Sequence, residues 1–136
     1  MRLLFSSLTL LILLFQFVSC GKVIKECTNI EYDGNITKLD GIPFSGSCYT
    51  YYNSGKLNSI QSYKNGKDHG EWVFYHQNGN IETKGTFKMG KRIGVWEYFY
   101  ENNQVYKRNI YDDNGKPKGN WVTYDYTGNL INTLTH

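Results

Sequence analysis

The sequence predicts an all-β fold: an elongated, twisted antiparallel β-meander of stacked hairpin repeats, about 24 residues each, preceded by an N-terminal signal helix. Two observations predict the meander. Glycines recur through the body of the 136-residue chain at intervals of 24, 24 and 25 residues. The composition is also rich in strand and turn formers, with 12 Tyr, 7 Phe and 14 Gly against 2 Pro. These features argue against both a helical bundle and a disordered chain.

The length of the chain indicates how many domains it forms, and its charge excludes one class of partner. A net charge of +3 is too small to indicate binding to nucleic acid. The length fits one small folded domain. We divide the chain into a lipoprotein-type signal peptide over residues 1–19, an N-terminal anchor and cap over 20–41, and a repeat domain over 42–136.

The first twenty residues have the pattern of an export signal. Arg2 precedes an apolar run from Leu8 to Val18, which is too short to favour a stable span of roughly 20 residues. Residues 17–20 resemble a bacterial lipobox, whose cysteine is acylated and becomes the mature N-terminus. The resemblance implies a lipid anchor at Cys20 on a membrane of the bacterial cell envelope. Ordinary cleavage, giving a secreted or periplasmic protein, and an uncleaved anchor are the alternatives.

Two cysteines remain once Cys20 is assigned to the anchor. In an exported chain, an even pair such as Cys27 and Cys48 commonly forms a structural disulfide. Closing the loop of 21 residues between them contributes about 3 kcal/mol on the chain-entropy model. Two buried free thiols are the alternative, because the sequence does not show whether the Cβ atoms face each other.

Each repeat unit begins with a glycine. Two residues later it has a tryptophan, or a cysteine in the first unit, and three positions further on an aromatic residue. The unit glycines are Gly46, Gly70, Gly94 and Gly119; the second position holds Cys48, Trp72, Trp96 and Trp121; the third holds Tyr51, Tyr75, Phe99 and Tyr124. A strand of about six residues, a tight turn, a strand of about seven and another tight turn make one unit. We expect the Trp and Tyr rings of neighbouring units to pack as the core.

Residues 22–41 do not follow this period. Residues 30–32 and 35–37 predict one further hairpin around Asp33-Gly34. We expect this segment to cap the edge of the first repeat, with Cys27 and Cys48 as its staple if they are bonded.

The pattern Gly-Lys-x-x-Gly-x-Trp-x-x-Tyr, followed by Asn-Gly, is similar to the MORN-type repeat, in the bacterial variant often labelled YwqK-family antitoxin. The resemblance covers about residues 41–131, and residues 66–72 and 90–96 match best. It implies an elongated antiparallel meander and a role in binding or scaffolding. We therefore expect a non-enzymatic module that binds another protein. An antitoxin or immunity protein that neutralises a toxin, and a glycan-binding module, are the alternatives.

No catalytic residue, cofactor or metal site is predicted. No Ser or Cys lies in a nucleophile motif, and the glycines serve the turns. His69 lies in a turn where the repeat commonly has histidine, and neither cysteines nor carboxylates accompany it at metal-ligand spacing.

Exposed aromatic side chains are the best candidates for a binding surface, because this sheet has apolar side chains on both faces. The candidates are Tyr52, Tyr98, Tyr100 and Tyr126. Packing against neighbouring units is their alternative role. Basic side chains also cluster at turns, namely Lys56, Lys67, Lys91, Arg92, Lys116 and Lys118. These either keep the edges soluble or form a basic rim that contacts anionic headgroups or envelope polymer.

Overall fold

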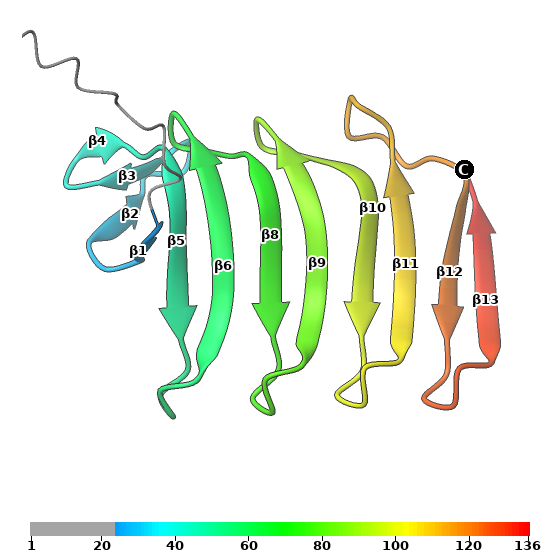
Figure 1. Ribbon diagram of the computed structural model, residues 1–136. Helices are drawn as coiled ribbons and strands as arrows, with labels where there is room; N and C mark the ends of the chain where they lie inside the picture. Colours follow the sequence, from blue (N-terminus) through cyan, green and yellow to red (C-terminus); the bar gives the residue numbers. More distant parts are fainter. Residues whose placement is uncertain (1–23) are drawn as a thin grey trace, which may run out of the picture.

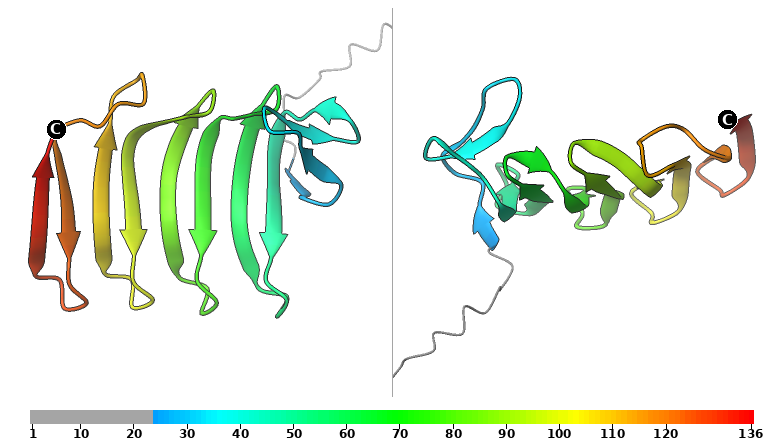
Figure 2. Two further views of the ribbon diagram at one scale, coloured as in Figure 1. Left: turned by 180° about the vertical axis from the view of Figure 1, so that it is seen from behind. Right: turned by 90° about the horizontal axis from the view of Figure 1, so that it is seen from above.

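The computed structural model describes residues 24–136, which form strands and turns. The predicted signal helix and Cys20 lie outside the described residues. The repeat region is one long antiparallel sheet that is a single layer thick (Figure 1, Figure 2). Residues 24–136 contain no helix, and hence none long and apolar enough to cross a membrane. The all-β hairpin fold predicted from the 24-residue period is confirmed for this part of the chain.

Four hairpins follow one another along the sheet. They are β5 (Gly46–Tyr51) with β6 (Leu57–Lys64), β8 (Gly70–Tyr75) with β9 (Ile81–Lys88), β10 (Lys91–Phe99) with β11 (Val105–Tyr111), and β12 (Asn120–Tyr124) with β13 (Leu130–Thr135). Antiparallel pairs β6·β8, β9·β10 and β11·β12 join neighbouring hairpins. The short strand β7 (Lys67–Asp68) also pairs with β6. Each hairpin is one sequence unit, so the order in space follows the order in sequence.

The cap differs in detail from the predicted hairpin. Strands β2 (Ile30–Tyr32), β3 (Thr37–Leu39) and β4 (Ile42–Pro43) form a separate three-stranded sheet. The prediction of a strand over 35–37 is wrong, because Asp33 Oδ1 accepts the amide N–H groups of Asn35 and Ile36, both at 3.0 Å. These bonds make 33–36 a turn, and the strand begins only at Thr37.

The first strand, β1 (Ile24–Glu26), pairs in parallel with β5 and covers the outer edge of the first hairpin. The amide of Cys27 continues this contact by donating to the carbonyl of Tyr49 at 2.9 Å. The sheet therefore begins with a protected edge, as expected of a cap.

A row of aromatic rings runs across the units. Ring centroids lie 5.5 Å apart for Tyr63 and Trp72, 4.8 Å for Trp72 and Phe87, and 4.8 Å for Phe87 and Trp96. Each tryptophan also donates its indole N–H to a carbonyl of the preceding unit: Trp72 to Ser62 at 2.8 Å, Trp96 to Thr86 at 3.2 Å and Trp121 to Ile110 at 2.8 Å. One side chain per unit thus links two hairpins by packing and by a hydrogen bond.

Burial along this row is uneven, because a single sheet has no second layer to cover it. Within residues 24–136 the buried apolar side chains are Phe44, Cys48 and Trp96, whereas Trp72 and Trp121 are half-buried. A guanidinium group, that of Arg92, lies 4.6 Å from the Trp96 ring centroid and covers it. The best-buried aromatic side chain of the repeats is therefore Trp96, near the middle of the sheet.

Candidate functional site

The hairpin tips, which form the lower edge of the sheet in Figure 1, are joined to one another by side chains. In three successive tips, one side chain bonds a carbonyl of the next unit: Tyr52 donates to Tyr75, His76 Nε2 lies 2.9 Å from the carbonyl of Phe99, and Tyr100 donates to Tyr124 at 3.0 Å. A carbonyl only accepts, so His76 carries its proton on Nε2. The hydroxyls of Tyr52 and Tyr100 therefore serve the contact between units.

Three tyrosines gather at the tips of the third and fourth hairpins. The ring of Tyr100 lies 5.1 Å from that of Tyr106 and 5.1 Å from that of Tyr126, measured between centroids. Tyr100 is held by its own hydrogen bond, whereas Tyr106 is 42% exposed and Tyr126 is 56% exposed. We call Tyr100, Tyr106 and Tyr126 the tyrosine cluster. It is an anchored ring flanked by two rings that are open to solvent.

Tyr98 lies two residues before Tyr100, in strand β10. The register of β10 shifts between Tyr98 and Phe99, and the strand ends before Tyr100, so the two tyrosines are not placed by simple alternation along a strand. Tyr98 is half-buried, and burial raises the pKa of its hydroxyl. The ammonium group of Lys107 lies 5.9 Å from the Tyr98 ring centroid and 5.9 Å from that of Trp121. A cation therefore lies beside the aromatic side chains of this region.

The structure groups the predicted tyrosines only in part. Tyr100 and Tyr126 are in contact and Tyr98 lies in β10, just before Tyr100, but Tyr52 lies at the tip of the first hairpin. The sequence prediction omitted Tyr106. Its signal is positional: Tyr106 occupies the place held by Asn58 and Glu82 in the first two units, and Tyr126 the place of Gln77 and Glu101. Aromatic residues at positions that are polar in the preceding units would have identified both, although the fourth unit has Ile131 at the position of Tyr106.

Acidic side chains of the turns are satisfied locally. The Asp112 carboxylate accepts backbone N–H groups of Asn114 and Lys116, both at 2.9 Å. Hydrogen bonds from the Thr127 hydroxyl and from Asn129 lower the pKa of Asp125 to about 2. These carboxylates stabilise Asx-type turns. Residues 24–136 contain no group of three His, Cys, Asp or Glu side chains placed to hold a metal ion.

The basic residues singled out in the sequence lie on two different edges. Five of them lie in or beside the turns that connect successive hairpins, namely Lys67, Lys91, Arg92, Lys116 and Lys118. Lys56 lies at a hairpin tip instead and donates its ammonium N–H to the carbonyl of Gln77 at 2.7 Å. All six residues therefore lie in or beside turns, but Lys56 is at the opposite edge of the sheet from the other five and does not belong to the same row.

On the face of the sheet opposite the Trp96 ring, a network of ion pairs crosses the three strands β9, β10 and β11. The Glu97 carboxylate lies 3.1 Å from Lys84 Nζ and 3.8 Å from Arg108 Nε. Glu97 and Arg108 also line a shallow depression together with Val105 and Tyr124. All three charged side chains remain partly exposed, so these pairs contribute little to stability.

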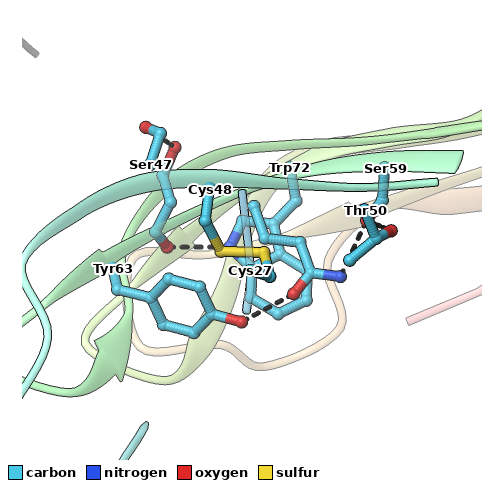
Figure 3. The surroundings of a disulfide bond; sticks show 9 residues. Cys27, Ser47, Cys48, Thr50, Ser59, Tyr63 and Trp72 are labelled. Carbon is cyan, nitrogen blue, oxygen red and sulfur yellow. Dashed lines mark hydrogen bonds between the residues drawn. A yellow bond between two sulfur atoms is a disulfide. The ribbon is translucent and has the colours of Figure 1, made fainter. Parts of the chain in front are cut away.

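Cys27 and Cys48 are joined by a disulfide bond, with their Cα atoms 5.1 Å apart (Figure 3). Cys48 is fully buried. Hydroxyl pairs join β5 to β6 near the disulfide: Thr50 with Ser59 at 2.8 Å, and, on the opposite face of the strand from Cys48, Ser47 with Ser62 at 2.8 Å. The bond fastens the residue that follows β1 to strand β5, in the position that tryptophan holds in the other units.

Comparison with known proteins identifies the repeat. Three consecutive segments, residues 45–65, 68–89 and 92–113, match the profile of the family described as MORN repeat variant. They coincide with the first three hairpins. No curated protein matches the chain.

Two solved structures resemble the chain weakly. A mutant of S. aureus TarM, crystallised with fondaparinux, alpha-GlcNAc-glycerol and UDP, is 18% identical with a TM-score of 0.41, over 79% of this chain and 20% of that one. The GtfA/B complex bound to UDP and GlcNAc is 9% identical with a TM-score of 0.33, over 78% and 23%. The chain thus spans less than a quarter of the length of either.

Proposed function

Because three consecutive units of this chain are MORN-type repeats, we propose that the protein is a non-enzymatic module that binds another protein through its repeat sheet. Repeats of this kind commonly bind proteins or membranes and are generally non-catalytic. The observation that carries the proposal is the tyrosine cluster, in which Tyr106 and Tyr126 stay exposed at positions that are polar in the preceding units.

The chemistry of the cluster suits a protein partner. Tyrosine combines a large apolar ring with a hydroxyl, loses little conformational entropy on binding, and is enriched at interface hot spots. The rings of Tyr100 and Tyr126 are inclined by 61°, and those of Tyr100 and Tyr106 by 54°. Such rings do not form one flat surface for stacking a sugar. The alternating ridges and hollows between inclined rings suit protein side chains better.

Loss of the two exposed rings tests this proposal. In the double variant Tyr106→Ser/Tyr126→Ser, we expect the yield of the partner cross-linked and purified from native membranes to fall roughly tenfold, because two anchor side chains are removed. The melting temperature should stay within about 2 °C of the parent, since surface changes cost little.

Tyr51→Ser is the matched control, because Tyr51 is 48% exposed but belongs to the first hairpin. It should leave the yield of the partner unchanged. Equal yields from the double variant and the control would contradict the assignment of the cluster. A toxin among the captured proteins would favour the antitoxin alternative, and loss of binding on a polysaccharide array would favour the glycan-binding one.

We further propose that the module acts in the bacterial cell envelope, attached through lipid on Cys20. The disulfide supports export, because such bonds persist in oxidising compartments. Cys20→Ala should move the protein from the membrane fraction to the soluble fraction, and abolish incorporation of labelled palmitate. Membrane attachment that survives Cys20→Ala would instead indicate an uncleaved apolar anchor.

A further inference from the structure

The last strand of the sheet has an edge that no other described strand covers. Inside the sheet, each second strand of a hairpin gives its outer edge to the first strand of the next unit, as in β6·β8, β9·β10 and β11·β12. Within residues 24–136, β13 pairs with β12 alone. Figure 1 shows β13 at the end of the sheet. Its outer edge therefore offers the same kind of backbone donors and acceptors that join the units.

The side chains of β13 do not protect this edge. Leu130 is 59% exposed, Ile131 is 61% exposed and Leu134 is 52% exposed. The sequence from Tyr126 to Thr135 contains no Asp, Glu, Lys, Arg or Pro. Charged side chains and prolines are the usual means by which proteins keep an edge strand from pairing. This strand thus combines exposed apolar side chains with an unopposed backbone edge.

The opposite edge of the sheet limits how two copies can meet. Strand β1 occupies the outer edge of β5, and the Cys27–Cys48 disulfide holds that region in place. A head-to-tail chain of copies would have to pair β13 with the outer edge of β1, which is only three residues long and therefore offers few backbone partners. The two β13 edges can still meet, and such an isologous contact closes at two copies.

We propose that β13 pairs with β13 of a second copy of this chain, in antiparallel orientation about a two-fold axis. Residues opposite each other in an antiparallel pair share a face, so the axis passes through one residue of the strand. With the axis at Asn132, Leu130 of each copy lies opposite Leu134 of the other. The uncharged strand brings no like charges together. This self-association does not depend on the tyrosine cluster or its partner.

The oligomeric state of the purified full chain tests the proposal. Size-exclusion chromatography with light scattering should give the mass of a dimer. Ile131→Lys and Leu134→Lys should each weaken the dimer at least tenfold. With the axis at Asn132, the two lysines at position 131 lie diagonally across it, whereas a lysine at position 134 places a charge where Leu130 and Leu134 would be in contact. Val95→Lys is the matched control: Val95 is 40% exposed on the inner strand β10, and its variant should remain dimeric.

Cysteine cross-linking tests the register. Asn132→Cys should form a disulfide-linked dimer on mild oxidation, because residue 132 faces its own copy across the axis, whereas Val95→Cys should not. A monomer in the parent protein would overturn the proposal. So would a dimer that survives both lysine variants, which is the result expected if the apolar leader caused the association. Absence of a cross-link at both Asn132→Cys and Thr133→Cys would also overturn it.

Discussion

Replacing Trp96 by alanine should lower the free energy of unfolding by about 3–5 kcal/mol, the range found for large aromatic truncations in cores. Trp96 is 2% exposed, packs on Phe87 with ring centroids 4.8 Å apart, and donates its indole N–H to Thr86 at 3.2 Å. The variant loses both of these interactions between adjacent hairpins and the burial of the indole ring. Denaturation in guanidinium chloride, followed by tryptophan fluorescence and far-UV circular dichroism, measures the effect.

Two further variants make this prediction specific. Trp121→Ala should cost less, because Trp121 is only half-buried in the last unit. Gly85→Ala should also destabilise this site, because a Cβ at Gly85 would lie 2.2 Å from Cδ2 of the Trp96 ring. Overpacking of this kind costs about 1–3 kcal/mol. A loss below about 1 kcal/mol for Trp96→Ala would show that the ring is not part of a core.

Reduction of the Cys27–Cys48 disulfide should cost about 3 kcal/mol, because it frees a loop of 21 residues in the unfolded chain. It also releases the cap strand β1, whose parallel pairing with β5 is only three residues long. The melting temperature should fall by about 10 °C or more on addition of reductant. Calorimetry with and without reductant measures the shift.

The double variant Cys27→Ala/Cys48→Ala is the control for this experiment. Its melting temperature should match that of the reduced parent protein and should not respond to reductant. Cys20 is present in both proteins, so it does not affect the comparison. A parent protein whose melting temperature is the same in both conditions would show that the bond does not stabilise the fold.

The repeat region could be predicted from sequence because its structure is periodic. Gly70, Gly94 and Gly119 adopt positive φ angles of 99°, 64° and 63°, so glycine recurs at the start of these units because the backbone there needs that conformation. The cap carries no such repetition. The three residues of β1 show no pattern that distinguishes a strand, and their parallel pairing with β5 depends on contacts that are distant in sequence. The topology of the cap therefore could not be predicted from its sequence.

The candidate binding surface was predicted less well than the fold. A tyrosine at a hairpin tip either bonds the next unit, as Tyr52 and Tyr100 do, or stays exposed, as Tyr126 does. The choice depends on whether a carbonyl of the neighbouring unit lies within reach of the hydroxyl, which composition and spacing do not reveal. Tyr106 is the instructive omission, because comparing equivalent positions across the units would have revealed it.

Each hairpin of this sheet pairs only with the hairpins beside it, so the protein has a modular length. Deleting or duplicating one 24-residue module would change the reach of the molecule by two strand spacings, about 10 Å, without altering the geometry of the remaining joints. The protected first hairpin would stay as it is. Duplication or loss of one unit in the gene would therefore change the distance between the capped end and the last strand in fixed increments.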